Sequence, residues 1–124
     1  MVIQGTKDIP RIILDHKTGV LRLGGTSAPE NAGNIFLPVI RWIRKYGVES
    51  DHKMHIEFSF TFLNSASTYI ISRIIKLLDK MSLSGKEVEI IWYYSTGDYD
   101  IKELGDELLY GVTCNHSIIE KEIG

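Results

Sequence analysis

The stretch Met54-His-Ile-Glu-Phe-Ser-Phe-Thr-Phe62 decides the fold, because apolar and polar residues alternate along its whole length. Side chains two residues apart in a strand point to the same face of a sheet. The expected apolar face holds Met54, Ile56, Phe58, Phe60 and Phe62, and the expected polar face holds His55, Glu57, Ser59 and Thr61. We therefore predict a β-strand with one face in the core and the other solvated or lightly covered.

The segment after this strand predicts a helix and then a second strand. Apolar residues recur at steps of three and four over residues 67–81, which is typical of an amphipathic helix, and Ser84-Gly85 is a stop signal. Residues 88–94 form an almost continuous apolar run, which favours a strand buried on both faces.

The segment before the central strand predicts a hairpin and a helix. Residues 11–15 and 20–24 read as two strands joined by a turn in which Asp15 and Gly19 supply the turn chemistry. Residues 31–46 carry a helical apolar pattern that contains Pro38, which removes one hydrogen bond. The helix either begins near Phe36 or has an irregular first turn, and we favour a start near Pro29 with a bend.

Residues 101–109 predict a short third helix, and residues 112–119 predict a last strand at the edge of the sheet. Strands that alternate with helices indicate α/β layers. The predicted fold is a single α/β domain over residues 1–124, in which an N-terminal hairpin extends a mixed sheet and helices pack on that sheet.

The composition excludes several classes of function. The 124 residues include 14 basic and 16 acidic ones, so the net charge of -2 offers no basic footprint for nucleic acid and no polybasic tract for a membrane surface. Cys114 is the single cysteine, and the four histidines are scattered, so we expect no disulfide, metal site or cofactor. We find neither a signal-peptide pattern in residues 1–10 nor a membrane-spanning stretch, and we expect a cytoplasmic protein without membrane insertion.

The segment Gly24-Gly-Thr-Ser-Ala-Pro-Glu-Asn31 first suggests a phosphate-binding loop. It lacks both the Gly-x-Gly-x-x-Gly spacing and a Walker lysine. Ser27 followed by Glu30 fits a capping box, with Pro29 in the first helical turn. We therefore interpret this segment as a helix start.

The turn Asn64-Ser-Ala-Ser-Thr68 lies between the central strand and the second helix. Asn64, Ser65 or Ser67 could cap the helix, but the turn holds more small polar residues than one cap needs. A phosphoryl group here would add about −1.5 to −2 charges close to the positive end of the helix dipole. Phosphorylation would thus leave the fold intact and change the surface that a partner meets.

Two catalytic alternatives use either Ser65 or the carboxylates Asp98 and Asp100. Ser65 as a nucleophile needs a nearby base, yet His52 and His55 lie at the opposite end of the strand. Asp98 and Asp100 could act as paired carboxylates in a small hydrolase or transferase, but they fit better as a cap and a first-turn charge for the third helix.

Three segments together resemble the SiaC-type family of regulatory phosphoproteins. They are residues 25–31, the turn at residues 64–67, and Trp92-Tyr-Tyr94 with Asp98, Asp100, Glu103 and Gly105. Their order and spacing match the family, and the resemblance covers nearly the whole chain.

The resemblance implies a non-enzymatic domain similar to the STAS domains of anti-sigma-factor antagonists. It implies phosphorylation at the strand-to-helix turn by a dedicated kinase and reversal by a PP2C-type phosphatase. In the best-known system of the family, the unphosphorylated protein binds and activates a diguanylate cyclase and so raises cyclic-di-GMP signalling.

The family pattern Asn-Thr-Ser-Ser maps onto residues 64–67, so the implied phosphorylation site is Ser65, a serine where the family usually has threonine. Ser67 and Thr68 remain alternatives for the modified hydroxyl. The expected partner-binding residues are Ser27, Pro29, Glu30, Asn64, Ser65, Ala66 and Ser67.

Overall fold

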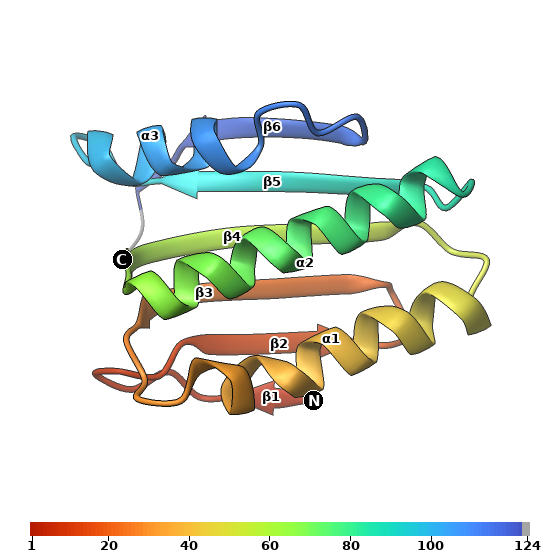
Figure 1. Ribbon diagram of the computed structural model, residues 1–124, viewed down its shortest axis with the longest axis horizontal. Coiled ribbons are helices and arrows are strands. Elements are labelled where there is room, and N and C mark those ends of the chain that lie inside the picture. The colour runs from red at the N-terminus through yellow and green to blue at the C-terminus, as the bar shows by residue number, and fades with distance from the viewer. Residues whose placement is uncertain (123–124) are drawn as a thin grey trace.

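The computed structural model describes residues 1–122, which form a six-stranded mixed sheet with three helices on one of its faces (Figure 1). The elements are β1 (Val2–Ile3), β2 (Arg11–Asp15), β3 (Val20–Ser27), α1 (Ala32–Glu49), β4 (Met54–Leu63), α2 (Ser65–Leu83), β5 (Val88–Tyr94), α3 (Tyr99–Leu108) and β6 (Asn115–Glu120). The predicted α/β fold is confirmed. The sequence pattern missed β1, because two residues are too few to show alternation.

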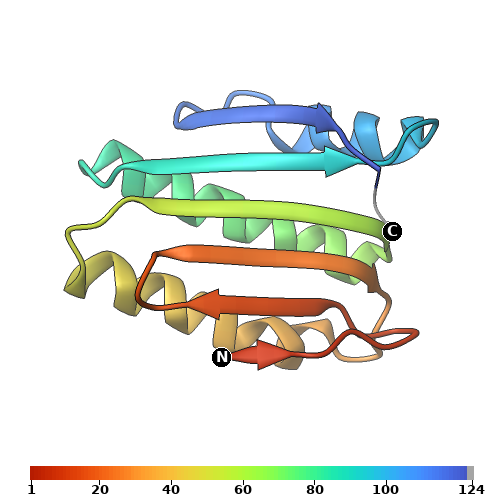
Figure 2. The same cartoon turned by 180° about the vertical axis from the view of Figure 1, so that it is seen from behind.

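The strands follow one another across the sheet in chain order. β1, β2 and β3 are antiparallel neighbours, whereas β3, β4, β5 and β6 run parallel. Each parallel connection moves one strand further in the same direction, and such connections are right-handed. Successive crossovers of one hand place α1, α2 and α3 on the same face, and the other face stays open (Figure 2).

The open face corrects the prediction for β5. Val88, Ile90 and Trp92 are buried against the helices, but Glu89 and Ile91 are only half-buried because no helix covers their side of the sheet. The prediction that β5 is buried on both faces is therefore wrong.

The core lies between the sheet and the three helices. Its largest fully buried side chains include Trp92, Tyr46, Phe36, Phe58 and Phe60. The indole of Trp92 donates a hydrogen bond from Nε1 to the carbonyl of Ile101 (2.9 Å), which joins β5 to α3. Gly105 of α3 packs so closely on Trp92 that a Cβ there would lie 2.6 Å from Nε1 of the indole.

A β-bulge interrupts the predicted alternation of β4 near its end. Gly25 of β3 pairs with Phe60, but the next residue, Thr26, pairs with Phe62, so Thr61 is the extra residue. Phe62 is 52% exposed as a result. The prediction that Phe62 shares the core face is wrong, because the bulge shifts the face on which later residues lie.

α1 begins later than predicted. Asn31 caps it by accepting a hydrogen bond at its side chain from the backbone N–H of Asn34 (3.3 Å), and Pro38 lies inside the helix. Ser27 is the last residue of β3, where it pairs with Leu63. The predicted capping box of Ser27 with Glu30 and the predicted start near Pro29 are therefore wrong, because sheet pairing extends through Ser27.

The other predicted ends are close to those observed. Gly19 closes the hairpin with φ +74° and Gly85 follows α2 with φ +106°, both in the left-handed region that favours glycine. α2 begins at Ser65 rather than residue 67, and β6 begins at Asn115 rather than residue 112.

Candidate functional site

The turn between β4 and α2 is held by Asn64, which caps the helix. The side-chain oxygen of Asn64 accepts a hydrogen bond from the backbone N–H of Ser67 (2.8 Å), and its amide group donates to the carbonyl of Pro29 (3.4 Å). The backbone N–H of Asn64 donates to the carbonyl of Ser27 (2.9 Å). Asn64 thus joins the ends of β3 and β4 to the start of α2.

The three hydroxyls that follow Asn64 have different environments. Ser65, the first residue of α2, is exposed. Ser67 is fully buried, and its Oγ lies 2.8 Å from the Oγ of Ser27, which is also fully buried. Thr68 is half-buried and donates its hydroxyl to the carbonyl of Asn64 (2.9 Å). Of these three residues, Ser65 is therefore the most accessible from solvent in the folded protein.

Burial divides the expected partner-binding residues into two groups. Ser27, Pro29 and Ser67 are buried, so their side chains offer no surface to a partner in this conformation. Glu30, Ser65 and Ala66 are exposed and Asn64 is half-buried. Of the expected contact residues, Glu30, Asn64, Ser65 and Ala66 therefore remain available to a partner, because the side chains of the other three are buried.

The start of α2 favours negative charge. Its first turn contains no acidic residue, and the first N–H groups of a helix lack partners within the helix. A phosphate on Ser65 would lie at this positive helix end while its oxygens remain in solvent. The turn can therefore accept such a group without repacking.

The catalytic alternatives lack supporting geometry. His55 pairs with Val20 and Glu89 at the beginning of the parallel strands, and His52 precedes β4, so both lie at the end of the sheet opposite Ser65. His116 pairs with Ile90 near the same end. Asp98 caps α3 by accepting from the N–H of Ile101 (3.2 Å), and Asp100 lies in its first turn, as predicted.

Cys114 and the acidic residues give no sign of metal or thiol chemistry. Residues 1–122 contain no group of three or more histidine, cysteine, aspartate or glutamate side chains arranged to hold a metal ion. Burial raises the pKa of the Cys114 thiol to about 11, and the nearby Asp79 carboxylate adds to this effect. The thiol therefore stays protonated at neutral pH, as expected of a buried structural cysteine.

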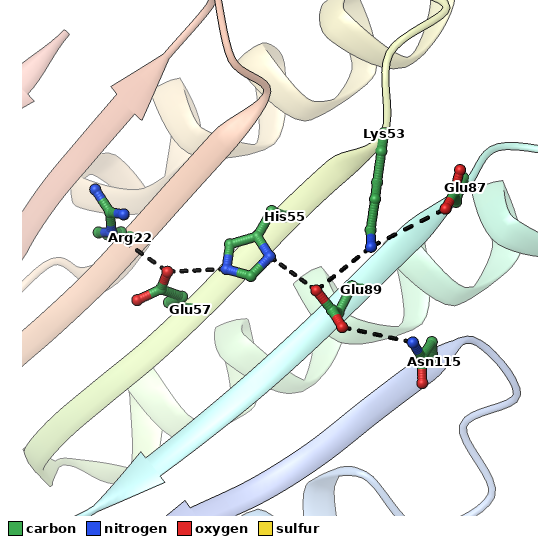
Figure 3. Close-up of polar contacts among 7 residues, drawn as sticks. All are labelled: Arg22, Lys53, His55, Glu57, Glu87, Glu89 and Asn115. Carbon is green, nitrogen blue, oxygen red and sulfur yellow. Dashed lines mark hydrogen bonds and ion pairs between the residues drawn. The ribbon is translucent and has the colours of Figure 1, made fainter. Parts of the chain in front are cut away.

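The open face of the sheet carries a polar network that the sequence pattern indicated only as a polar strand face (Figure 3). The ring of His55 contacts Glu89 through Nδ1 (2.9 Å) and Glu57 through Nε2 (2.8 Å). Arg22 lies 3.4 Å from Glu57, and Lys53 lies 3.5 Å from Glu89. The hydrogen bond from His55, aided by Lys53, holds the pKa of Glu89 below its usual range. The network pairs its charges internally, so it connects strands rather than presenting free charge.

Comparison with known proteins shows to which family the chain belongs. The family model described as "SiaC family regulatory phosphoprotein" matches residues 3–120. This chain belongs to the SiaC family. The resemblance to this family of regulatory phosphoproteins, seen in the sequence motifs, is therefore confirmed.

Proteins similar to this chain come from Pseudomonas aeruginosa. An uncharacterised protein of strain UCBPP-PA14 is 29% identical over 105 residues, which span 85% of this chain and 83% of that protein. The SiaC chain in a crystal structure of the diguanylate cyclase SiaD with its activator SiaC is 26% identical, with a TM-score of 0.93 over 98% of this chain and 99% of that one. Apo-SiaC is also 26% identical, with a TM-score of 0.88 over 95% and 96% of the two chains.

Over residues 1–122, no helix combines the length and apolar character that a bilayer crossing needs.

Proposed function

We propose that this chain is a phosphorylation-controlled binding protein that binds and activates a diguanylate cyclase while Ser65 is unmodified. Phosphorylation of Ser65 releases the cyclase. The proposal rests on membership of a regulatory phosphoprotein family and on similarity to SiaC, the activator in the complex with SiaD.

One observation carries the assignment of Ser65. Of the three hydroxyls that follow Asn64, that of Ser65 belongs to an exposed side chain, whereas Ser67 is fully buried against Ser27 and the Thr68 hydroxyl bonds to the Asn64 carbonyl. A kinase needs an accessible hydroxyl whose modification leaves the protein folded. Ser65 meets both conditions, and Ser67 meets neither.

The switch acts through the surface rather than through the fold. A phosphate adds about −1.5 to −2 charges and three acceptor oxygens at one point. The positive end of α2 stabilises this charge, so the domain stays folded. A partner that packs on the turn meets a larger and more negative surface, and its affinity falls.

The chain acts as a regulator and not as an enzyme in this proposal. Its partners are a dedicated kinase, a PP2C-type phosphatase and the cyclase. It meets all three in the cytoplasm. The support is that His52, His55 and His116 lie at the end of the sheet opposite Ser65, and that Asp98 caps α3.

The test combines mass measurement with binding. The cognate kinase is expected to add one phosphate to wild-type protein, to the Ser67→Ala variant and to the Thr68→Val variant, but none to Ser65→Ala. Ser65→Ala is expected to bind and activate the cyclase as wild type does, and Ser65→Glu to bind it more weakly.

The structural control is the circular dichroism spectrum and thermal transition of each variant. A Ser65→Glu protein that is folded and binds the cyclase with wild-type affinity, together with a phosphate found on another residue, would disprove the assignment. Loss of phosphorylation in Thr68→Val alone would move the site to Thr68.

A further inference from the structure

One exposed face of α2 runs from the Ser65 turn to the far end of the helix. Successive residues of an α-helix are rotated by about 100°, so Ser65, Tyr69, Arg73, Lys76 and Lys80 fall within an arc of about 80°. All five side chains are exposed. We call these five residues the α2 stripe. It begins at the proposed phosphorylation site and carries one aromatic and three cationic side chains.

The cations of the stripe have no acidic partners. Within residues 1–122, no carboxylate oxygen lies within 4.0 Å of Arg73, Lys76 or Lys80, nor of the neighbouring Arg44 of α1. Asp79 of α2 is engaged elsewhere, because it accepts hydrogen bonds from Thr113 and Cys114. The net charge of the protein is -2, so this cluster of unpaired cations is a local positive region on a slightly acidic protein.

A groove that combines apolar and cationic side chains adjoins the stripe. α1 and α2 lie side by side on the sheet, and between them a hollow of about 270 Å³ is lined by Ile40, Arg44, Arg73, Lys76, Leu77 and Lys80. A larger hollow of about 860 Å³ adjoins it at the C-terminal ends of the two helices and shares Arg44, Leu77 and Lys80. Asp51 and Glu87 line only this larger hollow.

The aromatic residue of the stripe, Tyr69, lies against Arg73. The guanidinium of Arg73 lies 5.9 Å from the ring centroid of Tyr69, and its Nη1 donates to the Tyr69 hydroxyl at 3.4 Å. Tyr69 remains 62% exposed. An exposed tyrosine beside an arginine has the composition of a protein-binding hot spot.

We propose that the α2 stripe and the adjoining groove bind an acidic amphipathic helix of the diguanylate cyclase. This inference rests on the proposed function and names the surface and the chemistry through which it acts. Apolar residues of the incoming helix would cover Ile40 and Leu77, and its carboxylates would face Arg44, Arg73, Lys76 and Lys80. The stripe from Ser65 to Lys80 is about 22 Å long, which suits a helix of about 15 residues.

The same arrangement explains how one phosphate controls binding. An acidic helix attracted along the stripe would approach Ser65 at its end, so a phosphate there would repel the groups that the lysines attract. The switch is therefore electrostatic as well as steric. Electrostatic attraction between exposed charges weakens as salt is added, whereas a steric clash does not.

The experiment measures affinity for the purified cyclase at about 0.05 and about 0.5 M salt. The Lys76→Glu/Lys80→Glu variant is expected to bind about tenfold more weakly at the lower salt, and Lys76→Arg/Lys80→Arg to bind as wild type does. Lys121→Glu is the matched control, because Lys121 lies over the Tyr93 ring at β5 and β6, away from the α1–α2 groove. It is expected to leave the affinity unchanged.

A second pair of variants separates charge from size at the switch. Ser65→Gln and Ser65→Glu add side chains of similar volume, so a weaker affinity of Ser65→Glu isolates the effect of charge. The gap between the two is expected to narrow as salt rises. Equal affinities of the two variants at low salt would overturn the electrostatic mechanism while leaving Ser65 as the switch.

The outcomes keep this inference distinct from the proposed function. If Ser65→Glu loses the cyclase but Lys76→Glu/Lys80→Glu binds it as wild type does, the α2 stripe is not the docking surface and the proposed function stands. If wild-type protein does not bind the cyclase, both fail. If the double variant loses binding to phosphatidylglycerol vesicles and keeps its cyclase affinity, the stripe binds membranes and the inference is wrong.

Discussion

The hydroxyl of Ser27 lies 2.8 Å from the hydroxyl of Ser67, and both side chains are fully buried. Ser27 ends β3 and Ser67 belongs to the first turn of α2, so this contact joins elements 40 residues apart beneath the exposed Ser65. The exposed Ser65 therefore sits above a buried contact between β3 and α2.

The stability effects of Ser27 and Ser67 should not be additive. The variant that lacks both hydroxyls is expected to lose less unfolding free energy than the sum of the losses in the two single variants. Ser27→Ala and Ser67→Ala each leave a buried hydroxyl without its partner, which costs about 1–3 kcal/mol of unfolding free energy. Urea denaturation of both single variants and of the double variant measures the coupling. Strictly additive losses would show that the two hydroxyls do not depend on each other.

The cap residue Asn64 should contribute to stability. Asn64→Ala is expected to lower the free energy of unfolding by about 1 kcal/mol and to speed hydrogen exchange at the Ser67 amide, which donates to Asn64. Asn31→Ala, at the N-cap of α1, is the matched control. It should destabilise the protein similarly without changing exchange at Ser67, and unchanged exchange in Asn64→Ala would contradict the cap.

A negative charge at position 65 should be tolerated or slightly stabilising. Ser65→Asp places a carboxylate at the first residue of α2, where it is expected to raise the free energy of unfolding by about 0.3–1 kcal/mol at low salt. Ser65→Lys should lower it by a similar amount. Thermal and chemical denaturation check both signs. A Ser65→Asp protein that unfolds readily would show that phosphorylation here acts by unfolding the domain.

Asp79 should make the free energy of unfolding depend on pH in the acidic range. Its partial burial acts to raise its pKa, but hydrogen bonds from Cys114 and Thr113 outweigh this, so the pKa lies below the ordinary 3.8. A carboxyl whose pKa is lowered by folding stabilises the protein above its unfolded pKa and loses that contribution as the pH falls through its folded pKa.

The variant Asp79→Asn tests this linkage. Wild type is expected to be more stable than Asp79→Asn at neutral pH, and the difference should shrink as the pH falls below about 4. Urea denaturation from neutral to acidic pH measures it. A difference that stays constant with pH would mean that the charge of Asp79 contributes nothing.

The surroundings of Gly105 and Gly33 predict opposite effects on stability when each is replaced by alanine. Gly105→Ala would force its Cβ against the indole, so we expect a loss of about 1–3 kcal/mol in unfolding free energy. Gly33→Ala, near the start of α1, meets only the Asn31 side-chain oxygen at 3.7 Å and should gain up to about 1 kcal/mol from helix propensity. Stabilisation by both substitutions would contradict close packing at Gly105.

Much of the fold and the position of the site follow from local patterns. The alternation in β4 and the helical period of α2 place the turn at residues 64–68 at a strand-to-helix junction. The turn chemistry of Asp15 and Gly19 and the cap at Asp98 were likewise predicted, because a hydrogen bond to a residue two or three positions away is encoded locally.

The sequence by itself therefore determined every element except β1, the order of those elements and a turn rich in hydroxyls. Only the tertiary structure decided that Ser65 is exposed while Ser67 is buried, because Ser27 covers Ser67 from another strand. It also decided that the open face extends across β5 and that a bulge turns Phe62 outward, since crossover handedness and strand register depend on neighbouring strands. Periodicity describes one segment at a time, whereas burial depends on what packs against it.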